Sequence, residues 1–234
     1  LLLAAQGYSP ETEAVMKRSQ ERAAQARAAE QTQPSENLPV SPEVAAKFQA
    51  CLDQAIDDPD KGAQFAEAWR IDRGGFHARQ CQGFAYARAE RWVPAATAFE
   101  QAAAEAERAG AVRDSARLLA QSGNAALAGG SADVARLRFD AALARGLPDG
   151  LEKGEVYLDR ARAKVALGDQ PGARSDFGHA VELAPTDPLA WLLSATLARR
   201  MNDLTLARQH IAQAVKLSPD DPAVALEEGN VAVL

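Results

Sequence analysis

Several features are scarce in this sequence, and each scarcity argues against a class of protein. Aromatic residues make up 6% of the 234 residues, and no stretch reaches the about eighteen apolar residues of a membrane span. Runs of valine, isoleucine and threonine are missing, so we expect no β-strand. Positive charge is not in excess either. The net charge of −6 and the isoelectric point of about 5.2 argue against nucleic acid or an anionic membrane as the main ligand.

The sequence also lacks the motifs that carry chemistry. It contains no phosphate-binding loop, no nucleophile elbow, no HExxH zinc motif and no Ser-His-Asp order. Of the three histidines, His77, His179 and His210, the last two fall in polar surroundings typical of an exposed surface. Carboxylates are abundant but scattered. The sequence therefore predicts no catalytic residue, no cofactor and no metal site.

What the sequence does contain is a repeat of 34 residues. Six pairs of positions between Gly154 and Asp221 match at this offset, beginning with Tyr157 and Trp191 (191 − 157 = 34). The other matched pairs are Ala161/Ala195, Ala173/Ala207, Phe177/Ile211, Ala180/Ala214 and Pro185/Pro219. In the second unit Trp191, Ala195 and Ala198 follow the spacing i, i+4, i+7, which places them on one face of a helix.

A large aromatic, a small residue, Ala-x3-Phe/Ile-x2-Ala and then Pro is a pattern that resembles the tetratricopeptide repeat (TPR) family. The resemblance implies an all-α, right-handed α-solenoid of about five helix–turn–helix repeats plus a partial sixth, each repeat covering the apolar face of the next. Asp187–Pro188 and Asp221–Pro222 are typical helix starts, with Asp as N-cap and Pro at the first helical position. The core residues we expect are Phe65, Tyr86, Phe99, Phe139, Tyr157, Phe177, Trp191 and Ile211.

We expect residues 41–234 to form the solenoid. Its predicted units are a degenerate repeat at 42–75, repeats at 76–115, 116–153, 154–187 and 188–221, and a partial repeat at 222–234. We expect either that the natural protein continues past Leu234 or that this end frays for lack of a capping helix. Extra residues of the longer repeats are expected in connections around 109–113 and 147–153. Residues 1–40 are predicted to be a solvated helix and a polar linker. Within this segment, Leu1–Ala5 is either the remnant of a secretion signal or an ordinary disordered terminus.

The two cysteines fall on the first helices of the first two repeats. Cys51 and Cys81 are 30 residues apart (81 − 51 = 30), and neighbouring first helices pack side by side in the TPR architecture. A disulfide between them would imply an oxidising compartment. Two buried free thiols are the alternative reading. A zinc site is disfavoured, since no second pair of ligands lies at the right spacing.

The resemblance implies a binding surface, because TPR proteins use a concave groove lined by first helices. Carried over by position, the groove residues are His77, Gln80, Phe84, Arg88, Arg117, Asn124, Leu158, Arg162, Leu192, Thr196, Arg199 and Arg200. We expect a protein or peptide to bind there, with acidic character recognised by Arg162, Arg199 and Arg200. The alternative is that these arginines belong to a solvated face.

Together these features predict a non-catalytic scaffold for protein–protein interaction, exported and acting in the envelope of a bacterium. High alanine and arginine usage favours a bacterial source, and the cysteine pair and Leu1–Ala5 favour export over a cytoplasmic location. The alternative is a TPR module of a larger enzyme, or of a secretion or assembly machine, whose active domain lies outside this chain. The partner, self-association and the face that binds stay open.

Overall fold

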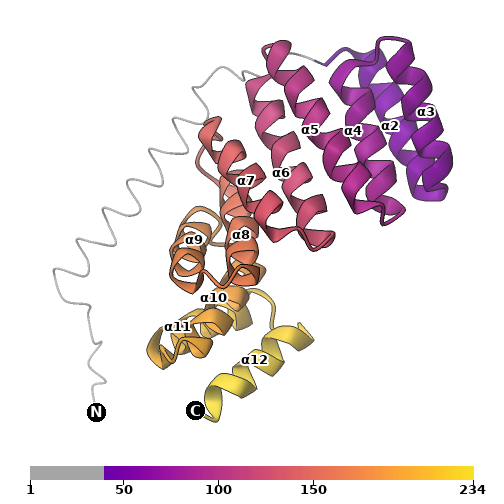
Figure 1. Cartoon of the computed structure of the whole chain (residues 1–234). Helices are drawn as coiled ribbons and strands as arrows, with labels where there is room; N and C mark the ends of the chain where they lie inside the picture. Colours follow the sequence, from indigo (N-terminus) through magenta and orange to yellow (C-terminus); the bar gives the residue numbers. More distant parts are fainter. Residues whose placement is uncertain (1–39) are drawn as a thin grey trace, which may run out of the picture. The chain divides into compact units, whose positions relative to one another are not determined.

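The structure is a computed structural model that describes residues 40–234, and this part of the chain is entirely helical (Figure 1). Our predictions for residues 1–39, including the secretion-signal remnant, lie outside the described residues. Each helix in residues 40–234 is too short or too polar to be a candidate membrane span. The helices are α2 (Pro42–Asp57), α3 (Pro59–Ile71), α4 (Gly75–Arg88), α5 (Trp92–Arg108), α6 (Val112–Ala128), α7 (Ala132–Ala144), α8 (Leu151–Ala166), α9 (Gln170–Leu183), α10 (Pro188–Arg200), α11 (Leu204–Leu217) and α12 (Pro222–Ala232).

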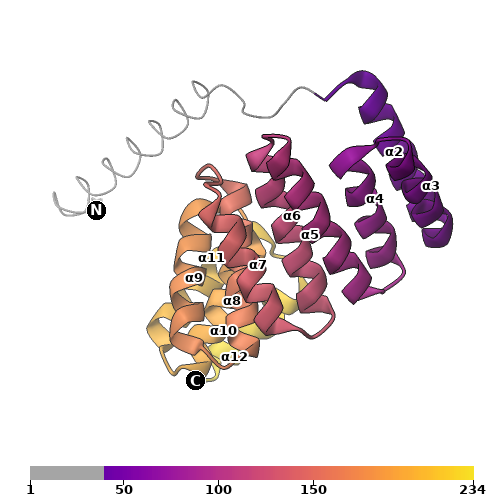
Figure 2. The same ribbon diagram turned by 45° about the horizontal axis from the view of Figure 1, so that its top comes forward.

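Consecutive helices form hairpins, and each hairpin packs on the next in chain order (Figures 1 and 2). The pairs are α2/α3, α4/α5, α6/α7, α8/α9 and α10/α11, and α12 packs on α10 and α11 as a further first helix. The first helices α2 and α4 also contact each other directly. This arrangement confirms the predicted all-α solenoid of TPR-like repeats.

The helix starts lie where the Ser-Pro and Asp-Pro pairs predict them. The Ser41 hydroxyl accepts a hydrogen bond from the backbone N–H of Val44 at 3.3 Å, and Asp187 and Asp221 cap α10 and α12 in the same way. A proline follows each of these caps, at a position where a helix needs no N–H donor. The local sequence therefore predicts these helix starts.

The third repeat begins earlier than predicted. Its first helix starts at Val112 rather than near Ala116, and α5 and α6 each span 17 residues. Of the residues expected in a connection around 109–113, residues 109–111 lie between α5 and α6, whereas 112 and 113 belong to α6. The later extra residues do form a connection, which runs through Gly146 and Gly150 at positive φ between α7 and α8.

First and second helices both contribute to the core. Phe99, Phe139, Phe177 and Ile211 are buried as predicted and pack between alanines of neighbouring helices. The other four predicted core residues are only partly buried: Phe65, Tyr86, Tyr157 and Trp191. The three of these on first helices carry a polar group that favours the surface. The indole N–H of Trp191, for example, donates to the carbonyl of Pro185 at 2.9 Å.

Close packing of a first helix on an aromatic ring makes Gly123 intolerant of a side chain. A Cβ added at Gly123 would lie 2.6 Å from the ring of the fully buried Phe139. We expect Gly123→Ala to lower the free energy of unfolding by about 1–3 kcal/mol, because crowding outweighs the gain of up to about 1 kcal/mol in helix propensity. Urea denaturation measures the change.

The matched control is Gly178→Ala, since a Cβ at this helical position in α9 would meet no atom within 4 Å. Only the gain in helix propensity remains there, so stability should stay equal or rise by up to about 1 kcal/mol. Equal effects of the two substitutions would contradict the close contact between Gly123 and Phe139.

Candidate partner-binding groove

Three successive first helices, α2, α4 and α6, form an open groove of about 420 Å³, called here the α2–α6 groove. Its lining residues are mostly apolar, and its polar members are all carboxamides. Phe48, Leu52, Phe84, Ala87, Trp92, Phe99 and Ala125 supply the apolar surface, and Gln80, Gln121 and Asn124 supply the carboxamides. No charged residue lines the groove.

Helical spacing explains why these residues share one surface. On α4, Gln80, Phe84 and Ala87 follow the spacing i, i+4, i+7 and therefore project from one face. Phe48 and Leu52 are four residues apart on α2 and extend the same surface. Because α2 and α4 contact each other directly, their two faces form a continuous wall.

The carboxamides can recognise a peptide backbone. The side-chain amide of Gln80 donates a hydrogen bond to the side-chain oxygen Oε1 of Gln121 at 3.3 Å, and this bond joins α4 to α6. The side chain of Asn124 is exposed. Each carboxamide carries two donors and an acceptor, so this pair retains hydrogen-bonding capacity beyond its mutual contact. The groove thus combines an apolar anchor site with groups that match N–H and C=O.

A disulfide between Cys51 and Cys81 joins α2 to α4 beneath the groove, with Cα atoms 6.2 Å apart. Both cysteines are fully buried, and Phe48 and Leu52 pack against them. The bridge therefore supports the residues that form the α2 wall of the groove.

Three of the twelve predicted groove residues, Gln80, Phe84 and Asn124, are brought together in the α2–α6 groove. His77 lies on α4 but stacks on Phe76, with ring centroids 4.0 Å apart, and its partial burial lowers the pKa of the imidazole. Arg117 pairs with Glu152 of α8 instead of lining the groove. Arg88 is exposed in the last turn of α4.

Two of the residues predicted to line the groove do not reach the surface, because the neighbouring repeats cover them. Leu158 and Leu192 are only 4% and 8% exposed. Leu158 packs in a cluster with Phe177, and Leu192 packs in another with Val224 of α12. Both leucines belong to the core and present no surface to a partner.

The arginines predicted to bind an acidic partner already have carboxylate partners in two of three cases. Arg199 donates from Nε to the nearly buried Glu227 at 2.7 Å, and Arg162 pairs with Asp159 at 2.8 Å within α8. Arg200 is exposed at the end of α10. Thr196, predicted beside them, donates its hydroxyl proton to the carbonyl of Leu192 on its own helix.

Carboxylates also gather at this part of the first-helix face. Partial burial, and then the neighbouring carboxylates of Asp187, Asp159 and Glu152, raise the pKa of Glu155. An anionic segment placed here would meet like charges. Carboxylates of α8 therefore stand on the same face as the arginines that were predicted to bind an acidic partner.

His210 does not lie on the open surface that the sequence predicted. Its Nδ1 is 2.8 Å from the hydroxyl of Ser194, its ring meets Trp191 edge-on, and burial lowers the pKa of the imidazole. Ser194 is buried in the middle of α10, where backbone N–H groups serve the helix. This contact packs α11 on α10.

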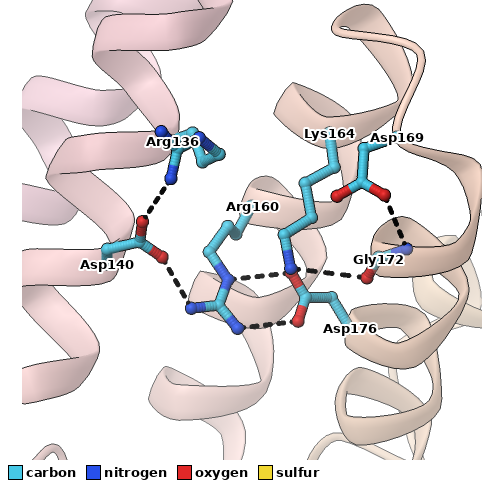
Figure 3. A network of polar contacts seen from close by, with 7 residues as sticks. All are labelled: Arg136, Asp140, Arg160, Lys164, Asp169, Gly172 and Asp176. Carbon is cyan, nitrogen blue, oxygen red and sulfur yellow. Dashed lines mark hydrogen bonds and ion pairs between the residues drawn. The ribbon is translucent and has the colours of Figure 1, made fainter.

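A buried ion network that the sequence did not reveal joins α7, α8 and α9 (Figure 3). The carboxylate of Asp176, 2% exposed, accepts from Arg160 at 2.7 and 2.8 Å and pairs with Lys164 at 2.8 Å. Arg160 also donates to Asp140 of α7 at 2.8 Å. Each of these buried charges has a partner inside the protein, so removing one partner would leave a buried charge uncompensated. Among residues 40–234, no group of three potential metal ligands occurs.

Comparison with known proteins supports the fold. No protein-family model matches the sequence, and no curated protein does. Among solved structures, the chain is similar to PilF of Pseudomonas aeruginosa, with a TM-score of 0.66 and 16% identity over 81% of this chain and 87% of that one. It is also similar to a structure of MamA from Desulfovibrio magneticus RS-1 that begins at residue 41 of that protein. The TM-score is 0.62, with 14% identity over 79% of this chain and 99% of that one.

A third similar structure is YrrB, described as a TPR protein with an unusual peptide-binding site. It has a TM-score of 0.57 and 16% identity over 76% of this chain and 90% of that one. At identities this low the likeness concerns the fold alone. The chain therefore has the fold of TPR proteins.

Proposed function

We propose that this protein is a non-catalytic interaction scaffold that binds a segment of another protein in the α2–α6 groove. The observation that carries the proposal is an open apolar surface edged by three carboxamides, Gln80, Gln121 and Asn124. An apolar anchor supplies affinity and polar groups fix the backbone, which is how peptide grooves and ligand sites are generally built. The peptide-binding site in the description of YrrB is consistent with this use of the fold.

Phe84→Ala should weaken peptide binding at least about tenfold, because a large aromatic side chain that lines a binding groove is the kind of residue that dominates binding energy. The probes are peptides selected from a random displayed library on the oxidised, full-length protein. Fluorescence anisotropy of the labelled peptides gives the dissociation constants, and circular dichroism verifies that each variant is folded.

The matched control is Leu137→Ala, since Leu137 is 54% exposed on α7 and does not line the groove. It should change the affinity by less than about twofold, as expected for an apolar residue outside the contact. Asn124→Ala is a second test, and because Asn124 is exposed, this substitution does not disturb the packing of the core. Selected peptides that bind both groove variants, Phe84→Ala and Asn124→Ala, like the wild type would refute the α2–α6 groove as the binding site.

We also propose that the protein is exported and works in a bacterial cell envelope. The disulfide between Cys51 and Cys81 supports an oxidising compartment, where such bridges form and persist. The test is the thiol state of protein taken from its native compartment. Cysteines that resist alkylation until a reductant is added agree with export, and free thiols would place the protein in a reducing compartment.

A further inference from the structure

We infer that the segment held in the α2–α6 groove is uncharged and anchored by an aliphatic or aromatic side chain. This inference rests on the proposed function and names the chemistry of its partner. None of the residues that line the groove carries a charge. An acidic segment, which the sequence favoured, would find no cation there.

Three basic residues on the same three helices are engaged in ion pairs, and Arg88, in the last turn of α4, is exposed but does not line the groove. Lys47 of α2 lies 3.5 Å from Asp72, Arg79 of α4 pairs with Glu105, and Arg117 of α6 pairs with Glu152. These ion pairs join a first helix to a neighbouring element. A charged side chain entering the groove would lose water without gaining a partner, which is costly.

The apolar part of the groove fits an anchor side chain. Phe48 and Leu52 on α2 stand on one side, and Phe84, with Trp92 at the start of α5, completes the surface. The volume of about 420 Å³ falls within the range of about 300–1,000 Å³ that holds small ligands and anchor residues. Around this surface the carboxamides of Gln80, Gln121 and Asn124 can pair with both the N–H and the C=O groups of a peptide backbone.

A pair of opposite substitutions at Asn124 tests the charge of the segment. The exposed Asn124 tolerates both Asn124→Asp and Asn124→Lys without loss of core packing. For an uncharged segment, each change removes the same carboxamide contact, so both should weaken binding by a similar factor of about 2–10. The probes are the library-selected peptides, and they should share a large apolar residue. Their affinity should change by less than about twofold between about 50 mM and about 500 mM salt.

The outcomes separate this inference from the proposed function. If Asn124→Lys tightens binding while Asn124→Asp weakens it, the segment is acidic and the inference is wrong, although the groove still binds peptides. The reverse pattern would show a basic segment. If the selected peptides ignore Phe84→Ala and both Asn124 substitutions, or if selection enriches no peptide, the proposed function fails and the inference fails with it.

Discussion

Replacing Asp176 with alanine is expected to lower the free energy of unfolding by about 3–5 kcal/mol, the usual cost of removing one partner from a buried ion pair. The carboxylate is buried and holds Arg160 and Lys164 at once (Figure 3). Without it, two cations with little access to water lose their main counterion, and only Asp140 still faces Arg160. Urea denaturation gives the total loss, and hydrogen exchange locates it in α7, α8 and α9.

Asp149→Ala is the matched control, because this aspartate also pairs with a lysine but lies at the surface. Its side chain is 67% exposed and accepts from Lys153 at 2.8 Å. Solvent screens this pair, so the substitution should cost less than about 1 kcal/mol. If Asp176→Ala costs no more than Asp149→Ala, the network does not hold the third and fourth helix pairs together.

The network also shows why part of the structure could not be predicted from the sequence. Arg160 contacts Asp140 and Asp176, which are 20 and 16 residues away and which only the stacking of three helices brings together. One signal was present. Asp176 falls three residues after Ala173 and next to Phe177, on the face that α9 buries. An acidic residue on a core face requires a cation, although the sequence does not say which one.

The sequence also predicted only some of the residues that line the α2–α6 groove. Gln80, Phe84 and Asn124 were predicted because the repeat period places them on the open face of regular first helices. Leu158 was predicted to line the groove, but it is buried. The repeat period predicts on which face of its helix a residue lies, and it does not predict how deeply the next repeat buries that face. Phe48 was not assigned to the groove, since the first repeat departs from the pattern. The fold itself was predictable because caps, turns and the Ala-x3-Phe spacing are local and repeat.

The second large expected effect concerns the bridge between Cys51 and Cys81. Reduction of the wild-type protein should lower the stability of α2 and α3 by about 3–4 kcal/mol, the chain-entropy value for a closed loop of 30 residues. In stacked repeats, terminal units open separately from the rest. Hydrogen exchange should therefore show faster opening of α2 and α3, while α8 to α11 keep their protection.

Cys51→Ala/Cys81→Ala is the control, because it removes the cross-link permanently and cannot respond to reductant. Its α2 and α3 should exchange as fast as those of the reduced wild type or faster, since both sulfurs are buried and their packing is also lost. Reductant should leave the variant unchanged. A reductant effect on the variant would mean that the change in the wild type does not come from the disulfide.

The same experiment bears on binding, because α2 supplies one wall of the α2–α6 groove. Phe48 and Leu52 pack against the cysteine pair and line the groove at the same time. If the bridge holds this wall in place, reduction should lower the apparent affinity for the selected peptides in proportion to the fraction of molecules in which α2 has opened. Leu52→Ala should also lower the affinity of the oxidised protein. Equal affinity in the two redox states, with faster exchange in α2, would mean that the walls on α4 and α6 bind the segment by themselves.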